Sequence, residues 1–464
     1  MSHGEVTIKA QLVEQNERIP IDATYASKYS LFVRFSNGKN FGDGAEFSKL
    51  IFPVDDDNAE LGPCRLISEP NIDGYAGRLI FLNDVYDFNN LISNKKIVKL
   101  QSSFINLPLI LSRKSNIEPY FKDFTANLTY DLSVYKNLFD TVDIEQQNEP
   151  ENVRQFVQKA IIGTEGEKFM RFLDDTLEEL ERIVSDFTKE EHERHGFYFR
   201  KQLWDYIMCS PFMTRTNLKP RGYAGDSEMM RMIYAKDYHN ESTFSKLMHR
   251  HPIEHPAAQA VRNRRDLIVR MTNEVRNNQS MSSRKKCKVL SVACGPAFEM
   301  QDILVSPEDC ERYHFTLLDQ DRCALFEAAE LIDHIEKSLN KKINVDYLNE
   351  SVRTMLSTPQ LKNKWGQFNF IYSMGLFDYL TPPVAKSVLK KLFDLLSPGG
   401  EMIVGNFHVS NPSKYYMEYW CDWVLYYRTE EEFRNLLGDI PSAKVDVCFE
   451  DTGCQMFLHA KRLE

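Results

Sequence analysis

Short apolar runs that end in small or polar residues follow one another through the last third of the chain. Residues 289–292 lead into a turn of small residues, and residues 316–318 end at the acid Asp319. Runs of this length, with a helix after the first, predict a doubly wound α/β fold whose mostly parallel sheet ends in an antiparallel hairpin. The later runs are 368–373, 402–407, 444–450 and 454–461, and Asp451, Thr452 and Gly453 join the last two as a hairpin turn.

The first 115 residues follow a different pattern, in which apolar and polar residues alternate over short segments. Residues 29–35 and 77–82 are examples, and clusters of turn residues such as 37–40 and 71–74 separate them. Short alternating segments between turns predict strands of a small β-barrel or sandwich. We therefore expect a β-rich accessory domain in residues 1–115.

Between these regions, residues 116–280 have the pattern of long amphipathic helices. Apolar residues recur there at helical spacing with acids between them, and we interpret them as a stripe that faces the core. The chain is thus expected to divide into the accessory domain, a helical linker or lid region, and a ligand-binding domain at 281–464. The stripe contains Phe169, Phe172, Leu173, Leu177, Leu180 and Ile183.

Composition limits the partners and the compartment. The net charge of −10 argues against a nucleic acid as the main substrate, because neutralising phosphates requires a basic surface. The basic run at residues 262–265 is interpreted as a solvated helix face. The nine cysteines include no C-x-x-C pair and no cysteine–histidine cluster of zinc spacing, so no metal site is expected. With no signal-like N-terminus and no membrane-spanning apolar run, we expect a cytoplasmic protein.

The small-residue turn and the later acid are spaced like parts of a mononucleotide-binding unit. Asp319 follows Gly295 by 24 residues, close to the roughly 20 residues of such units. There, small residues let the backbone approach the ligand, and the carboxylate can accept both ribose hydroxyls. No phosphate-binding G-x-G-x-x-G is present, which indicates an adenosine ligand without a pyrophosphate, and S-adenosylmethionine fits this description.

A loop at residues 217–226 interrupts the helical region. Pro220 and two glycines break the helical pattern, and Arg221, Tyr223 and Asp226 lie close together in the loop. In one interpretation the loop is a structural turn whose Arg221 and Asp226 pair locally. In the other it is a lid over the carboxyl ends of the sheet, where Arg221 binds a substrate carboxylate, Asp226 is a further substrate contact and Tyr223 orients the cofactor.

A second cluster follows the strand expected at residues 402–407. His408 should lie at the carboxyl end of that strand, where doubly wound sheets bind ligands, and is a candidate base. It could equally be a core histidine bonded to a backbone carbonyl. The aromatic segment 415–427 either covers an apolar substrate pocket, with Tyr427 as a substrate contact, or packs on the sheet as a helix.

Four motifs together resemble a known family. They are Lys-Pro-Arg-Gly-Tyr-Ala-Gly-Asp at 219–226, Ala-Cys-Gly-Pro-Ala-x-Glu at 293–299, Leu-Leu-Asp-Gln-Asp at 317–321 and Asp-Trp-x-Leu-x-Tyr-Arg-Thr at 422–429. With the expected sheet, they are similar to class I S-adenosylmethionine-dependent methyltransferases. Within that family they resemble a bacterial subfamily described as similar to 3-hydroxypalmitic acid methyl ester biosynthesis proteins.

The resemblance implies S-adenosylmethionine as the cofactor and places its binding residues. Family members usually carry an acid where this chain has Ser291, so Glu299 is expected to supply the charge toward the amino group of the ligand. The loop after the third strand is expected to contact the adenine. The implied cofactor-binding residues are Ala293, Gly295, Pro296, Glu299, Asp319, Gln320, Asn349, Glu350, Ser373 and Gly375.

The N-terminal region faintly resembles PilZ-type barrels, which bind cyclic di-GMP, through the turn at residues 71–77. An adaptor or dimerisation barrel is the favoured interpretation, and we expect any homo-oligomer to form through this domain.

Taken together, these features imply a cytoplasmic bacterial methyltransferase that acts on a small molecule. The candidate acceptor is the carboxylate of a hydroxy fatty acid or acyl compound, which needs no base. A hydroxyl or amine acceptor would need one, and His408 and Tyr223 are the candidates. The alternative is a regulatory binding protein whose methyltransferase-like domain is not catalytic.

Overall fold

The structure is a computed structural model, and the chain folds as two compact units, Met1–Asn116 and Ile117–Glu464. The turns at 37–40 and 71–75, which include most of the PilZ-like segment, lie outside the described residues. The structure describes residues 8–15, 17–27, 30–36, 41–54, 57–68, 76–84, 86, 88, 107–108, 111–236, 238, 242–278, 286–438 and 443–463.

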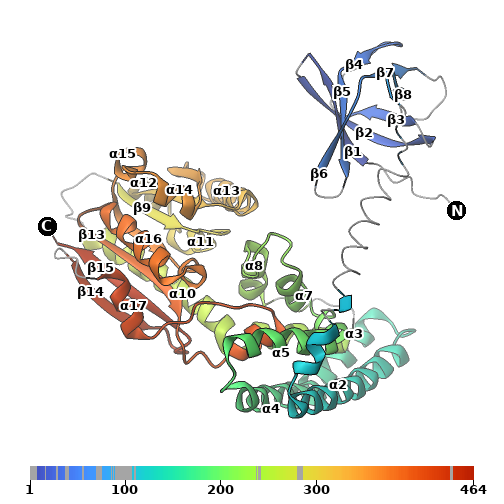
Figure 1. Cartoon of the computed structure of the whole chain (residues 1–464). Helices are drawn as coiled ribbons and strands as arrows, with labels where there is room; N and C mark the ends of the chain where they lie inside the picture. The colour runs from blue at the N-terminus through green and yellow to red at the C-terminus, as the bar shows by residue number, and fades with distance from the viewer. Residues whose placement is uncertain are drawn as a thin grey trace. The chain divides into compact units, whose positions relative to one another are not determined.

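Eight strands make up the first unit: β1 (Ile8–Glu14), β2 (Glu17–Ser27), β3 (Ser30–Phe35), β4 (Glu46–Phe47), β5 (Lys49–Val54), β6 (Asp57–Leu61), β7 (Cys64–Ile67) and β8 (Gly77–Phe81). They form one antiparallel sheet in the order β4-β7-β8-β3-β2-β1-β5-β6 (Figure 1). Only Ser48 separates β4, which pairs with β7, from β5, which pairs with β1. Its N–H and hydroxyl donate to the Val13 carbonyl at 2.9 and 2.8 Å, so the sheet closes into the expected small β-barrel.

Seven strands form the sheet of the second unit: β9 (Cys287–Val292), β10 (Tyr313–Asp319), β11 (Val345–Asn349), β12 (Phe368–Ser373), β13 (Leu396–Phe407), β14 (Ala443–Phe449) and β15 (Gln455–Arg462). Their order is β11-β10-β9-β12-β13-β15-β14. The first five strands are parallel, whereas β15 pairs antiparallel with β13 and β14. The predicted parallel sheet with a final hairpin is confirmed. The strand order reverses between β9 and β12, where doubly wound sheets bind ligands.

Helices cover both faces of this sheet (Figure 1). Apolar side chains of β9, β10 and β12 pack against α10 (Pro256–Asn278), α11 (Met300–Ile303), α12 (Pro307–Arg312) and α13 (Arg322–Leu339). The other face packs against α14 (Val352–Ser357), α15 (Leu361–Trp365), α16 (Pro382–Asp394) and α17 (Glu430–Leu437). The part of the second unit that surrounds the sheet therefore has three layers, with a buried apolar cluster on each side of the sheet.

The helical region before the sheet forms a further apolar core. The predicted stripe on its fourth helix is confirmed, since Phe169, Leu173 and Leu180 are buried and the other members pack against them. The helices are α2 (Pro119–Glu145), α3 (Glu151–Ile161), the π-helix η2 (Ile162–Gly166), α4 (Glu167–Val184), α5 (Lys189–Gln202), α6 (Trp204–Ile207), α7 (Pro211–Leu218), α8 (Ser227–Ala235) and α9 (Thr243–Glu254). Every helix among the described residues is too short or too polar to cross a membrane.

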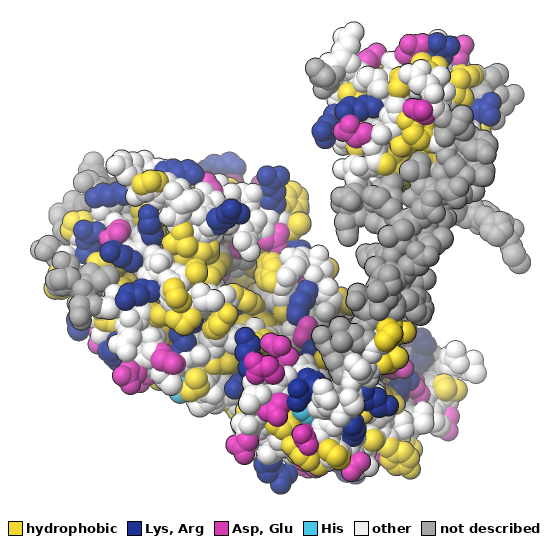
Figure 2. Space-filling model, in the orientation of Figure 1, with side chains coloured by type: hydrophobic (Ala, Val, Ile, Leu, Met, Phe, Trp, Pro, Cys, Tyr) yellow, Lys and Arg dark blue, Asp and Glu magenta, His cyan; other side chains and the backbone are white. Residues whose placement is uncertain are grey.

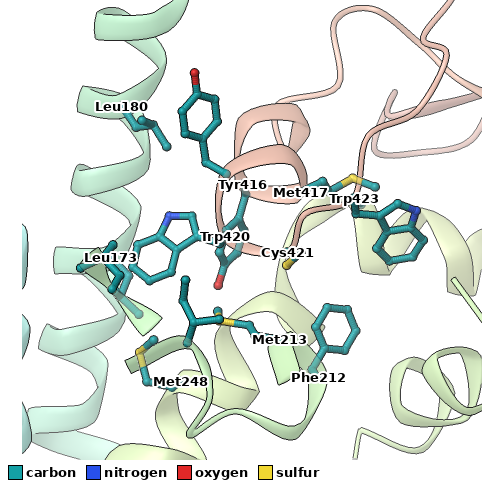
Figure 3. Close-up of a cluster of buried hydrophobic side chains, with 14 of the residues drawn as sticks. Leu173, Leu180, Phe212, Met213, Met248, Tyr416, Met417, Trp420, Cys421 and Trp423 are labelled. Atoms are coloured by element: carbon teal, nitrogen blue, oxygen red, sulfur yellow. The ribbon is translucent and has the colours of Figure 1, made fainter. Parts of the chain in front are cut away.

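The aromatic segment after β13 lies in this helical core. Its π-helix η4 (Tyr416–Trp420) packs among side chains of α4, α7 and α9 (Figure 3). The Tyr416 hydroxyl lies 2.7 Å from Nδ1 of His251, and the Tyr419 hydroxyl lies 2.9 Å from Nδ1 of His192. The segment thus neither packs on the sheet as a helix nor stands alone as a cover. It joins the helical region and the sheet into one unit.

We expect Trp420→Ala to lower the free energy of unfolding by about 3–5 kcal/mol, because the side chain is 1% exposed and its loss leaves a cavity. Urea denaturation followed by circular dichroism measures the change. Phe156→Ala is the control, since Phe156 on α3 is 75% exposed and should change the stability by less than about 0.5 kcal/mol. Equal effects of the two substitutions would contradict the central role of η4.

Candidate cofactor and substrate site

A cavity of about 360 Å³ opens at the carboxyl ends of β9, β10 and β12. Its floor comes from the loop after β9, the end of β10 and the segment after β12. Its opposite wall comes from the loop 219–226 and from α8 and α10. Segments that lie more than a hundred residues apart therefore meet at the ligand-binding edge of the sheet.

The loop after β9 is wound unusually tightly. Ala293, Gly295 and Ala297 all have positive φ values, of 53°, 57° and 52°. Two alanines in this conformation cost about 1–2 kcal/mol each, because Cβ crowds the following carbonyl. Strain of this kind gathers at ligand sites, and here it keeps small side chains and backbone along the cavity.

The carboxylate of Asp319 holds this loop to the end of β10. Its Oδ2 accepts the N–H of Gly295 and its Oδ1 accepts the N–H of Asp321, both at 2.9 Å. The side chain is 6% exposed, and burial raises its pKa above the ordinary value. Each carboxylate oxygen can accept a second hydrogen bond, so Asp319 can still bind two ligand hydroxyls in the cavity.

The expected adenine side lies beside Asp319. Gln320 and Glu350 line the cavity, and Glu350 is also paired with Lys364. Asn349 is exposed and donates its amide to the backbone carbonyls of Asp319 and Gln320, at 3.1 and 3.0 Å. The structure thus brings Gln320 and Glu350 to the cavity, while Asn349 holds the two chain segments together.

Glu299 lies at another point of the floor, where the loop after β9 enters α11. It accepts a hydrogen bond of 2.7 Å from the hydroxyl of Tyr372, which is 2% exposed. Burial raises the pKa of Glu299, and this hydrogen bond opposes the shift. Pro296 and Gly375 also line the cavity, whereas Ser373 is buried behind it and donates to the Val292 carbonyl at 2.9 Å.

The loop 219–226 forms part of the opposite wall through Tyr223 and Gly225. Arg221 pairs with Glu327 at 2.7 Å and with Asp321 at 3.2 Å, and so ties the loop to the start of α13.

The first and last residues of the loop also form ion pairs. Lys219 pairs with Asp422 at 2.6 Å. Asp226 is fully buried, pairs with Arg215 at 2.7 Å and caps α8 through the N–H of Met229. The local pair of Arg221 with Asp226 that one interpretation required is replaced by these separate ion pairs.

The backbone of Gly225 packs tightly against aromatic side chains outside the loop. A Cβ atom at this position would lie 2.6 Å from Cζ2 of Trp423 and 2.8 Å from the hydroxyl of Tyr379. The indole N–H of Trp423 donates to that hydroxyl at 2.9 Å. Only glycine leaves room for this packing, which presses the loop against the rim of the cavity.

His408 and Tyr427 lie outside the cavity, and so do the other candidates Arg221, Asp226, Asn349 and Ser373. His408 is half-buried beside Phe449, and its Nδ1 lies 2.6 Å from the Ser410 hydroxyl. Tyr427 lies near Met417, with the Lys414 ammonium 5.6 Å from its ring.

Sequence reasoning missed the contribution of α8 and α10. The run 262–265 is not a solvated face at Arg264, which is 9% exposed and lines the cavity. A signal was present, because the buried positions of α10 recur every three or four residues and Arg264 belongs to that series. The series is Ala257, Ala260, Val261, Arg264, Ile268, Thr272 and Val275.

The cavity offers few side chains that could act as a general base. Its described lining residues include neither histidine nor lysine. Burial and the neighbouring Asp319 and Asp321 raise the pKa of Tyr223, so its phenol is neutral and can donate a hydrogen bond. Burial likewise raises the pKa of Tyr379. The site is therefore suited to positioning and excluding water more than to removing a proton.

No family model matches the chain, and no curated protein matches it. Among solved structures, it is similar to magnesium protoporphyrin IX methyltransferase from Synechocystis with bound SAH, with 11% identity over 44% of this chain and 86% of that one, at a TM-score of 0.34. It is also similar to the N-methyltransferase NodS from Bradyrhizobium japonicum in complex with S-adenosyl-L-homocysteine, with 12% identity, 46% and 90% coverage, and a TM-score of 0.31. A SAM-dependent methyltransferase from Methanosarcina mazei matches with 16% identity, 39% and 94% coverage, and a TM-score of 0.30. The strand order itself gives the chain the fold expected of class I methyltransferases.

Gly225→Ala should displace the loop from the cavity rim, since the added methyl group would overlap Trp423 and the Tyr379 hydroxyl. Overpacking of this kind costs about 1–3 kcal/mol, which we expect as a lower thermal midpoint and weaker binding of S-adenosylhomocysteine. Calorimetry and thermal unfolding measure the two effects. Gly163→Ala is the matched control, because its Cβ would meet nothing within 4 Å. If Gly225→Ala behaved like this control, the close packing would be unimportant.

Proposed function

We propose that this protein is an S-adenosylmethionine-dependent methyltransferase that acts on a small molecule. The observation that carries the proposal is the Asp319 carboxylate, oriented by two backbone N–H groups and facing a cavity at the switch point of the sheet. A tight loop of small residues beside it and a second acid, Glu299, suit a ligand with a ribose at one end and an amino group at the other.

The residues present fit this cofactor without a phosphate-binding loop. Asp319 would hold the ribose hydroxyls, Gln320 and Glu350 would lie beside the adenine, and Glu299 would face the amino group. Ala293, Gly295, Pro296 and Gly375 would let the backbone approach. When bound, the cofactor supplies a methyl group on a sulfonium, which needs no further activation by the protein.

The acceptor is proposed to carry its own nucleophilic anion. A hydroxyl or amine acceptor would require a base, but the described lining has no histidine or lysine and Tyr223 is neutral. The lining acids are already engaged: Asp319 and Glu299 are assigned to the cofactor, and Glu350 pairs with Lys364. A carboxylate needs no base, which favours an acid such as a hydroxy fatty acid or acyl compound. The resemblance to the bacterial subfamily points the same way, and Tyr223 would then orient the reacting groups by donating a hydrogen bond.

Surface charge also supports a small acceptor. On the face drawn in Figure 2, Lys and Arg side chains are set among apolar and uncharged ones and are mixed with Asp and Glu side chains. Binding a nucleic acid needs a basic surface that follows the phosphates. The net charge of −10 acts against such binding.

Asp319→Ala should weaken the binding of S-adenosylhomocysteine by about 2 kcal/mol, because two charge-assisted hydrogen bonds to the ribose would be lost. Titration calorimetry compares the variant with wild type. Asp333→Ala on α13 removes an exposed acid, paired with Lys337, and should bind like wild type. Unchanged affinity in Asp319→Ala would remove this residue from the site.

Incubation with methyl-labelled cofactor tests both turnover and acceptor class. We expect label in the acidic lipid fraction of a cell extract, as base-labile methyl esters, and none in total RNA. Label in RNA alone would overturn the acceptor proposal. Tight binding of the cofactor with no transfer to any fraction would favour the regulatory alternative, in which the domain is not catalytic.

A further inference from the structure

Arg264 is an arginine buried in the wall of the cavity. It projects from α10 at a position that the helix otherwise fills with small or apolar side chains, and it is 9% exposed. Its guanidinium donates to the Met374 carbonyl at 3.1 Å and contacts the Met230 sulfur at 3.2 Å. A Cβ atom on Gly375 would lie 3.8 Å from both terminal nitrogens, so the group sits at the carboxyl end of β12.

Among the described residues, no carboxylate oxygen lies within 4.0 Å of the Arg264 guanidinium. The neighbouring arginines Arg215, Arg221 and Arg265, in contrast, each form an ion pair with an acid. Burial raises the pKa values of Glu299 and Asp378, and the charge of Arg264 opposes this rise, but both acids are engaged by other donors. Glu299 accepts from Tyr372, and Asp378 accepts from the Phe407 N–H at 2.7 Å.

Such an arrangement is costly for the protein alone. A buried charge loses its hydration and is tolerated when it is paired. A guanidinium offers five donors, of which a carbonyl, a thioether and the Tyr234 hydroxyl use only part. An apolar side chain at this position would stabilise the helix packing equally well or better. A ligand anion in the cavity would complete the hydrogen bonding.

We infer that Arg264 binds the carboxylate of a ligand in this cavity. The inference rests on the proposed function in that it takes the cavity to be the ligand site. Two carboxylates could occupy the position: the α-carboxylate of the methionine part of the cofactor, or that of the acceptor. The nearby Glu299 makes the first the expected source, because an anion and a cation at one end of the cavity match a zwitterionic amino acid.

The test compares wild type with Arg264→Met, which keeps the length of the side chain and removes its charge. Calorimetry measures binding of S-adenosylhomocysteine and of the same compound without its α-carboxylate. We expect the variant to bind S-adenosylhomocysteine on the order of tenfold to a hundredfold more weakly and the decarboxylated compound as wild type does. Arg270→Met, an exposed position on the same helix, is the control and should leave both affinities unchanged.

A second readout separates ligand binding from a structural role. Without ligand, the thermal midpoint of Arg264→Met should equal or exceed that of wild type, because an uncompensated buried charge has been removed. A midpoint several degrees lower, with both affinities unchanged, would show that Arg264 only supports the fold and would overturn the inference.

Octanoate titrations, with and without saturating S-adenosylhomocysteine, distinguish the source of the carboxylate. Octanoate binding that is lost in Arg264→Met, with S-adenosylhomocysteine affinity retained, would support the inference and assign the acceptor carboxylate. If wild type bound no S-adenosylhomocysteine, the proposed function would fail. The octanoate arm would then decide alone: loss of binding in the variant supports the inference, and retained or absent binding overturns it.

Discussion

Two backbone N–H groups that converge on one carboxylate set the geometry of the site. The Asp319 carboxylate accepts hydrogen bonds from the N–H of Gly295, in the loop after β9, and from the N–H of Asp321, in the turn after β10. The side chain of Asp321 in turn forms an ion pair with Arg221, and it lies 3.4 Å from the Tyr223 hydroxyl. The floor of the cavity and the loop that faces it are therefore linked through one short acidic turn. Loss of Asp319 would disturb both walls.

The cavity also depends on how two kinds of secondary structure are joined. The segment 408–428 leaves the sheet at β13 and places η4 in the core of the helical region. From there Trp423 returns to press on Gly225 at the cavity rim. Because the same segment packs in both places, the helical region is part of the binding unit, and the expected boundary near residue 280 does not separate two independent bodies.

Whether an arginine near the cavity is free to bind a ligand anion depends on which acidic side chains of the protein already pair with it. Arg221, proposed from the sequence to grip a substrate carboxylate, already pairs with Asp321 and Glu327. Arg264, interpreted from the sequence as solvated, lies buried in the cavity wall, and in the part of the chain that the structure describes no carboxylate pairs with it. Under our inference Arg264, and not Arg221, would bind the ligand carboxylate. The sequence could not distinguish them, because pairing is a property of neighbours in space.

Local patterns were sufficient for whatever depends on neighbours in sequence. Alternation predicted the barrel, apolar runs predicted the sheet and its hairpin, and small residues before an acid predicted the meeting of Gly295 with Asp319, since a strand–turn–helix–strand unit can place them in only one way. The tertiary structure alone decided where the aromatic segment packs, that Arg264 lies in the cavity wall with no carboxylate partner among the described residues, and that His408 and Tyr427 lie outside the cavity. Those outcomes depend on packing between segments that lie more than two hundred residues apart, such as His192 and Tyr419, and the hydrophobic pattern of a single segment carries no record of its partner.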